Sequence, residues 1–258
     1  MDFALAGHRI VLTGGGSGIG HAAVDFLLRC GATVSTCARD LDRLRESWRD
    51  LDPETARRLH LFRCDVFAND QVGRFAFDAA RAMDGIDGLV VNANSSSGGD
   101  APKTTASQYS KDVNQNIAAA AHPIMTTLPY LRRSECPRIV IVDGVAGRTP
   151  DPALASRSSA PAALGSYTTS LSFALAKDRI GVNRVRVGVI DTPHQRERHR
   201  ESGSELSYED WLRSEAAKRR IPYKRVGTPS EVAGPIAFLL SPLSSYMTGT
   251  ALDVSGGK

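Results

Sequence analysis

The sequence has no run of apolar residues that reaches the ~18 needed to span a membrane as a helix. Its first residues show none of the charged start, apolar stretch and small-residue cleavage site of a signal peptide, so we expect a cytoplasmic protein. Cysteine is scarce: the 4 cysteines form no CxxC pair, which favours reduced structural thiols over a disulfide framework or a metal site. Internal repeats and low-complexity linkers are also absent, which favours a single domain.

An unbroken basic stripe, the usual sign of a nucleic-acid binder, is missing as well. The 32 basic and 28 acidic residues leave a net charge of +4, and most of the basic residues are arginines interleaved with acids. In residues 196–201, RERHRE, this mixture predicts a solvated helix face, with phosphate binding as the alternative. We therefore expect neither a nucleic-acid partner nor a membrane partner.

Short β-branched runs alternate with segments in which apolar residues recur at helical spacing, such as the segment from Val72 to Met83. Strands separated by helices form parallel βαβ units. The predicted fold is thus an α/β doubly wound parallel sheet of the Rossmann type, with helices on both faces, over residues 1–258.

Local signals predict the bounds of individual elements. Thr228 to Glu231 match a capping box with proline in the first turn, and the Ser-, Ala- and Pro-rich stretch 149–163 is predicted to be a loop. The predicted strands are Arg9–Thr13, Thr33–Ala38, Leu59–Asp65, Leu89–Ala93, Arg138–Asp143, Val182–Ile190 and Thr250–Val254.

A glycine-rich segment, TGGGSGIG at 13–20, follows the first predicted strand and opens a helix. Glycines let the backbone turn tightly and approach a pyrophosphate, while a helix N-terminus offers free N–H groups and the positive end of its dipole. Many tight turns need glycine, but the placement between a strand and a helix favours a dinucleotide site over a plain βα turn.

This segment matches the TGxxxGIG fingerprint of the short-chain dehydrogenase/reductase family, which essentially the whole chain resembles. Cys64-Asp65-Val66 is similar to the family's adenine-contacting Asp-Val, and Asn92-Ala93-Asn94 to its Asn-Ala-Gly. Residues 182–193 resemble its RVN…PGxxxTP stretch, and 225–227 and 248–257 its two C-terminal segments. The resemblance implies a nicotinamide cofactor bound by Gly14, Ser17, Gly18, Ile19, Gly20, Asp65, Val66, Asn92, Ala93, Ile190 and Thr192.

The end of the second predicted strand bears on the choice between NAD and NADP. An aspartate there accepts hydrogen bonds from the 2′-hydroxyl of NAD and repels the 2′-phosphate of NADP. This chain has Ala38 followed by Arg39, and a guanidinium is suited to bidentate phosphate binding. A solvated loop arginine is the alternative, but the pattern favours NADP(H) over NAD(H).

The resemblance also implies an Asn-Ser-Tyr-Lys tetrad, of which this chain retains the asparagine, Asn116. Gly144 stands where the serine that polarises the carbonyl is expected. In many family members the tyrosine lies thirteen residues after that serine and twenty-six before the asparagine of RVN, and both counts end at Arg157. Pro161 then takes the lysine position. Because proline is tolerated mainly in the first helical turn, we expect the helix to start near 160, with Ser158 and Ser159 as caps and Arg157 in the preceding loop.

A competing alignment makes Tyr167 the family tyrosine. It requires the deletion of two helical turns and still places Leu171 at the lysine position. Ten helical residues advance ~15 Å, so Tyr167 cannot replace a residue at 157 without a large rearrangement. We therefore predict that Tyr167 is a packed core or interface residue.

Three functions are compatible with this pattern. Arg157 stays protonated and cannot act as an acid, but it can stabilise an alkoxide while water supplies the proton. The first hypothesis is an NADP(H)-dependent oxidoreductase that acts on a carbonyl/alcohol pair through Asn116, Arg157 and Asp143, the last as a proton relay unless it caps a turn. Residues 194–222 would form its substrate loop.

The second hypothesis is an NADP(H)-binding pseudoenzyme that serves as a sensor or inactive partner subunit. The third, weaker, is non-redox chemistry on the same fold. The resemblance also implies a homodimer or homotetramer.

Overall fold

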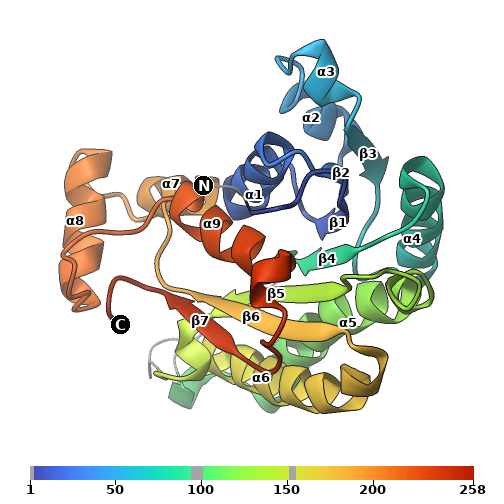
Figure 1. The fold of residues 1–258 in the computed structure, drawn as a ribbon. Coiled ribbons are helices and arrows are strands. Elements are labelled where there is room, and N and C mark those ends of the chain that lie inside the picture. Colours follow the sequence, from blue (N-terminus) through green and yellow to red (C-terminus); the bar gives the residue numbers. More distant parts are fainter. Residues whose placement is uncertain (1–2, 94–100, 151–154) are drawn as a thin grey trace.

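Seven parallel strands form one sheet in the order β3-β2-β1-β4-β5-β6-β7 (Figure 1). This computed structural model describes residues 3–93, 101–150 and 155–258, so Asn94 of the Asn-Ala-Asn motif lies outside the described residues. The predicted α/β doubly wound parallel sheet is confirmed. The strands are β1 (Arg9–Thr13), β2 (Thr33–Ala38), β3 (Leu59–Arg63), β4 (Gly88–Val91), β5 (Arg138–Gly144), β6 (Gly181–Val187) and β7 (Ala251–Val254).

The first two strands have the predicted bounds, and each of the others differs by one to three residues at one end or at both. The largest difference is in β6, which was expected to continue to Ile190 but ends at Val187. Ile190 forms an isolated parallel bridge with Gly227 instead. The apolar run outlasts the strand because Ile190 is buried in a hydrophobic cluster beside the sheet, so its hydrophobicity reflects packing rather than sheet pairing.

Helices cover both faces of the sheet, as Figure 1 shows: α1 and α9 pack on one face, and α4, α5 and α6 on the other. The capping box at Thr228 is confirmed at the start of α9. The helices are α1 (Gly18–Arg29), α2 (Leu41–Glu46), α3 (Pro53–Ala56), α4 (Asn69–Met83), α5 (Ala106–Leu131), α6 (Ala155–Leu175), α7 (Pro193–Glu201), α8 (Tyr208–Lys218) and α9 (Pro229–Leu240). Short 3₁₀ turns are η1 (Ala101–Lys103), η2 (Val145–Gly147), η3 (Ala176–Asp178) and η4 (Pro242–Ser244). Within the described ranges, no helix has both the length and the apolar character needed to cross a bilayer.

Side chains of the central strands alternate between two hydrophobic cores. In β1, Ile10 and Leu12 are buried in the core on the α1 and α9 side, whereas Val11 between them belongs to the core on the α4, α5 and α6 side. Successive side chains of a strand point to opposite faces, so an almost continuous apolar run is what a strand covered on both faces requires. This double burial holds the strand ends in place for the site described below.

Helix α6 starts earlier than the sequence predicts. The predictions of a loop over 149–163 and of a helix start near 160 are wrong for residues 155–163, which are helical and include Pro161. A proline at 161 removes the hydrogen bond to the carbonyl four residues earlier, and the tight packing of this turn against η2 outweighs that loss: a Cβ built on Gly147 would lie 2.7 Å from the amide nitrogen of Ala162. Ser159 does not cap the helix, because its hydroxyl donates to the carbonyl of Ala155 at 3.1 Å within the first turn.

The sheet order reverses between β1 and β4. The chain runs outward from β1 to β3, returns through α4 to β4 on the other side of β1, and then runs outward to β7. In open parallel sheets, ligands bind beyond the carboxyl ends of the strands at such a switch point. The topology therefore directs attention to the segments that follow β1, β4, β5 and β6.

Candidate functional site

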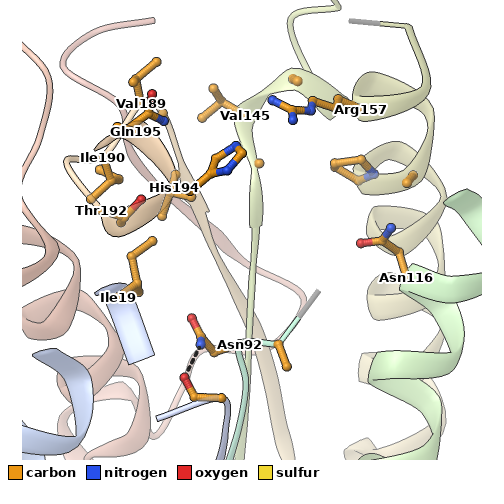
Figure 2. Close-up of a pocket in the computed structure, with 18 of the residues that line it drawn as sticks. Ile19, Asn92, Asn116, Val145, Arg157, Val189, Ile190, Thr192, His194 and Gln195 are labelled. Atoms are coloured by element: carbon orange, nitrogen blue, oxygen red, sulfur yellow. Dashed lines mark hydrogen bonds between the residues drawn. The ribbon is translucent and has the colours of Figure 1, made fainter. Parts of the chain in front are cut away.

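The main cavity of the described structure, about 800 Å³, lies at this switch point. It is lined by residues that follow β1, β2, β4, β5 and β6 and by the first turns of α6 and α7. In Figure 2, Ile19 and Asn92 lie at one end of the pocket and Arg157 and Val145 at the other. Ten of the sequence-predicted site residues line it: Gly14, Ser17, Ile19, Arg39, Asn92, Ala93, Asn116, Arg157, Ile190 and Thr192.

Several positions of the glycine-rich turn can be occupied only by glycine. Gly14 and Gly18 have φ values of +80° and +56°, in the left-handed region that favours glycine. Gly20 does not line the pocket but supports the turn from below: a Cβ there would lie 2.0 Å from the carbonyl oxygen of Gly14. The side chain of Ser17, the N-cap of α1, makes no capping hydrogen bond within the described structure. The first N–H groups of α1 therefore remain available to an anion in the pocket.

Asn92 joins the glycine-rich turn to the end of β4. Its side-chain Nδ2 donates to the carbonyl oxygens of Thr13 and Gly14, both at 3.2 Å; Figure 2 shows one hydrogen bond of this side chain as a dashed line. The backbone N–H groups of Asn92 and Ala93 donate to the buried Thr13 hydroxyl at 3.0 and 3.2 Å. These bonds clamp two strand ends on either side of the switch point, so Asn92 acts as a structural support of the pocket floor.

Arg39 lies at the end of β2, exposed, between the main pocket and a second cavity of about 560 Å³. Its side chain makes no hydrogen bond or ion pair with any described residue. Asp65 lines the second cavity, and its carboxylate accepts a hydrogen bond from the backbone N–H of Phe67 at 3.0 Å. Val66 is buried and lines neither cavity. Arg39 and Asp65 thus share one cavity, whereas Val66 and the supporting glycines Gly18 and Gly20 lie behind the pocket surface.

The other end of the pocket contains the residues that align with the family's catalytic positions. Gly144, Arg157 and Pro161 all line it, together with Asn116 from α5. A Cβ built on Gly144 would have Pro161 Cγ as its nearest neighbour at 3.7 Å, an ordinary contact distance, so the fold has room for a side chain there. Asn116 is buried, and its Nδ2 donates to the carbonyl of Asp112 at 2.8 Å.

Arg157 is half-buried in the first turns of α6, where Figure 2 shows it above the pocket. The prediction that it lies in a loop is therefore wrong, for the packing reason given above. Its buried Nε has no hydrogen-bond partner among the described residues. Burial lowers the pKa of Arg157, and the charges of Arg198 and Arg219 lower it further, against the opposing effect of Asp112. A group with a normal pKa near 12.5 remains a cation at neutral pH.

Tyr167 lies on the same helix as Arg157, ten residues further along, which corresponds to ~15 Å. It packs against the hydrophobic core between the sheet and α4, α5 and α6, and burial raises its pKa. It is not among the residues that line the pocket. The structure thus brings residues 144, 157 and 161 together and leaves Tyr167 in the core.

Asp143 does not lie in the pocket lining, so its predicted role as a proton relay has no geometric support. Strand alternation turns the Asp143 side chain away from the pocket and under α6, where it is buried and pairs with Arg184 of β6 at 2.7 Å. The burial of Asp143 raises the pKa of its carboxyl to about 6, even though Arg184 and Arg186 act in the opposite direction. One carboxylate oxygen, Oδ1, has no partner among the described residues. Asp143 is thus a buried acid of the sheet.

Residues 194–222 form α7, α8 and their connections beside the pocket. The Tyr208 hydroxyl at the start of α8 donates to Asp191 Oδ1 at 2.5 Å, and the Arg196 guanidinium lies 4.3 Å from the centre of the Tyr208 ring. The run 196–201 is only partly a solvated face: Arg200 pairs with Glu197 at the surface, but Arg198 packs on Trp211 and pairs with Glu215 of α8.

The polar pocket residues that sequence reasoning did not single out include His194, Gln195 and Arg219 of the segment 194–222. Their only signal was membership of the predicted substrate loop. Burial lowers the pKa of His194, and the positive charges of Arg157 and Arg198 lower it further. This imidazole is therefore neutral at pH 7, and it faces the pocket between the two ends in Figure 2.

Comparisons with known proteins cover nearly the whole chain. The protein-family model described as enoyl-(acyl carrier protein) reductase matches residues 14–258. A tropinone reductase homolog from Datura stramonium is 30% identical over 259 residues, which span 99% of this chain and 93% of the relative. An NADPH-bound short chain oxidoreductase from Pseudomonas aeruginosa PAO1, described as containing an atypical catalytic center, is 33% identical with a TM-score of 0.90, covering 98% of this chain and 97% of the other. L-sorbose reductase from Gluconobacter frateurii, in complex with NADPH and L-sorbose, is 26% identical with a TM-score of 0.91, covering 100% and 98%.

Proposed function

This chain belongs to the short-chain dehydrogenase/reductase family, and we propose that it is an NADP(H)-dependent oxidoreductase. In this proposal the protein interconverts a carbonyl compound and an alcohol. Its site lacks the serine, tyrosine and lysine that the family uses. One observation carries the proposal: a single pocket joins the glycine-rich turn and Asn92 to Asn116 and Arg157. The similarity to an NADPH-bound oxidoreductase with an atypical catalytic center supports it.

The residues present fit a nicotinamide dinucleotide. Gly14, Gly18 and Gly20 have conformations or neighbours that exclude a side chain, and the N–H groups at the start of α1 are open to a pyrophosphate. At the end of β2, the guanidinium of Arg39, which has no partner among the described residues, is suited to a 2′-phosphate. Ile190 and Thr192, beyond β6, complete the lining on the side toward α7. This donor set favours NADP(H) over NAD(H).

The nicotinamide, when bound, supplies the hydride that adds to the carbonyl carbon. In this proposal, Arg157 occupies the position of the family's tyrosine. Its permanent positive charge stabilises the negative charge that develops on the substrate oxygen. Because Arg157 keeps its proton, the oxygen takes its proton from water. Asn116 is the residue that positions this water, as the family resemblance implies. Pro161 lines the pocket and contributes no charge.

A second candidate function rests on the same substitutions. A positioned proton donor contributes ~10²–10⁴ in rate, and this chain has Arg157 and Pro161 where the family has a phenol and an ammonium. A protein that binds NADP(H) without turnover, as a sensor or inactive partner subunit, would need the nucleotide end of the pocket and nothing more. This alternative predicts tight cofactor binding and no reaction.

We further propose that residues 194–222 form the substrate loop and that the protein is a homodimer or homotetramer. The loop proposal is supported by His194, Gln195 and Arg219, which line the pocket. The oligomer proposal is supported by two exposed apolar side chains on adjacent helices, Met125 of α5 and Phe173 of α6, which are 62% and 79% exposed.

The test is NADPH oxidation across a panel of aldehydes and ketones, together with a direct titration of NADPH binding. We expect turnover of at least one carbonyl compound, and we expect Arg157→Met to abolish it while NADPH still binds. The matched control is Arg213→Met, an exposed arginine that pairs with Asp210 on α8 and should leave both measurements unchanged. Tight binding without turnover across the panel would establish the pseudoenzyme, and full activity in Arg157→Met would remove Arg157 from the mechanism.

A further inference from the structure

Three arginines from three helices surround the end of the pocket away from the glycine-rich turn. Arg157 comes from α6, Arg198 from α7, and Arg219 follows the last turn of α8. Arg157 and Arg219 line the cavity directly. Arg198 and Arg219 are close enough to Arg157 for their charges to depress its pKa. These residues are called the arginine cluster below.

The acids beside this cluster do not balance it. Glu215, which is 9% exposed, accepts hydrogen bonds from both Arg198 and Arg219, at 3.1 and 3.4 Å. Asp112, which is fully buried in α5, is the acid whose charge acts on Arg157. Three guanidinium groups therefore share two carboxylates, which leaves one positive charge. Lys218 also pairs with Glu215, but it is 66% exposed and screened by solvent.

Hydrogen-bond donors in the cluster are also unused. The Nε atoms of Arg157 and Arg219 are both buried and have no partner among the described residues. A buried donor without an acceptor is unfavourable, and a buried cation without a counter-ion is more so. The described lining of the cavity contains no aspartate or glutamate side chain. The side chains of Arg157 and Arg219, which both line the cavity, would thus present positive charge to an incoming anion, with no aspartate or glutamate side chain in the described wall.

The phosphates of the dinucleotide do not account for this cluster. The glycine-rich turn and Asn92 lie at the opposite end of the pocket from Arg157 in Figure 2, with His194 between them. Arg39, the cation assigned to the 2′-phosphate, follows β2 and borders the second cavity. The arginine cluster is therefore placed beside the position of the reacting carbonyl and is open to the substrate.

We propose that the substrate is an oxo acid, a carbonyl compound whose carboxylate binds the arginine cluster through Arg157 and Arg219. A planar carboxylate matches the fork of a guanidinium bidentately, and its single negative charge equals the excess charge of the cluster. The neutral imidazole of His194 adds a polar group at the same wall. This inference rests on the proposed oxidoreductase function and specifies its substrate class.

A matched pair of ligands tests the proposal without relying on turnover. Benzoylformate and its methyl ester carry the same ketone and differ in the carboxylate charge. Their dissociation constants are measured by calorimetry on the protein saturated with NADP⁺, and their kcat/KM values with NADPH. We expect the acid to bind at least about tenfold more tightly than the ester, since truncating one partner of a buried charge pair commonly has an effect of this size or larger.

Variants identify the responsible residue. Arg219→Gln should reduce the acid-to-ester binding ratio to near one, Arg219→Lys should retain most of it, and Arg213→Gln on the exposed face of α8 should leave it unchanged. An unchanged ratio in a folded Arg219→Gln, or equal binding of acid and ester by the natural chain, would overturn the proposal. Tighter binding of dihydroxyacetone phosphate than of benzoylformate would also overturn it, in favour of a phosphate group. A preserved charge preference without any NADPH oxidation would reject the oxidoreductase function and keep the anion site.

Discussion

The two ends of the pocket are built in different ways. At the nucleotide end, the main functional groups are backbone N–H groups of a turn in which Gly14, Gly18 and Gly20 cannot be replaced without strain or a clash, supported by Asn92 and Thr13. At the reaction end, the functional positions 144, 157 and 161 are defined by side chains on a strand end and a helix. The first kind of site is inseparable from the fold, because its groups are the backbone itself. The second kind can change completely while the fold is retained, as the glycine, arginine and proline at these positions show.

The largest effect is expected when the residues of the reaction end are replaced. The triple variant Gly144→Ser, Arg157→Tyr, Pro161→Lys restores the residue types that the family uses, and a side chain at 144 meets nothing closer than 3.7 Å. A positioned proton donor is worth ~10²–10⁴ in rate, or roughly 3–5 kcal/mol. We expect a gain of that order in kcat/KM for neutral ketones with NADPH, measured by absorbance. In the same assay, Tyr167→Phe should have no effect on the natural protein; a loss of activity there would show that Tyr167 is the reacting phenol.

At the nucleotide end, position 20 should not accept even one methyl group. Gly20→Ala places a Cβ 2.0 Å from the carbonyl oxygen of Gly14 and 2.6 Å from Asn92 Nδ2. Overpacking of this kind costs about 3 kcal/mol, so we expect a large drop in stability in urea and a loss of NADPH binding. Gly16→Ala in the same turn is the control, since its nearest neighbour is Leu44 Cδ1 at 3.3 Å and a small shift of that side chain relieves the contact. Comparable damage from both variants would contradict the steric account.

In our proposal Arg39 sets the preference for NADP(H), so reversing its charge should weaken the binding of NADPH and not that of NADH. Arg39→Asp removes a charge-assisted contact worth about 1.5–3 kcal/mol and adds repulsion toward a 2′-phosphate. We expect NADPH binding to weaken at least tenfold while NADH binding is unchanged or improved, both measured by fluorescence titration. Arg43→Asp, an exposed position on α2, controls for the general loss of positive charge. Equal weakening of both cofactors by Arg39→Asp would reject the assignment.

The smallest expected effect is on stability and concerns Asp143, the buried acid that does not line the pocket. The pKa of Asp143 is about 6 in the folded protein, above the ~3.9 of an unfolded aspartate. Its contribution to stability is therefore complete below pH 4 and is lost as the pH rises through 6. Between pH 7 and pH 5 the natural protein should gain about 1 kcal/mol relative to Asp143→Asn. Urea unfolding at pH 5, 6 and 7 measures the difference, and parallel profiles would contradict it.

Most of the fold was predictable because its signals are local. The strands β1 and β2 have the predicted bounds, and the capping box correctly marks the start of α9. The errors arose where tertiary packing outweighed a local preference. Pro161 was taken to mark a helix start, but the close contact of α6 with Gly147 keeps the helix through it. Ile190 was counted as strand because it is apolar, but it is buried beside the sheet.

The site divides in the same way. Eight of the predicted cofactor residues, together with Asn116 and Arg157, were named from the sequence and line one pocket, whereas Gly18, Gly20, Asp65 and Val66 do not. His194 and Arg219 were missed, because nothing local in the sequence marks a loop residue as part of the pocket wall. Asp143 was misplaced because the alternation of side chains in β5 decides which face it meets.

The sequence by itself determined the sheet, the glycine-rich turn and the absence of a phenol and an ammonium at positions 157 and 161, because each depends on residue type and spacing along the chain. Only the tertiary structure decided that Arg157, Arg198 and Arg219 converge with too few carboxylates beside them. Charge balance depends on distances between segments that are far apart in the chain, and those distances exist only once the helices are packed.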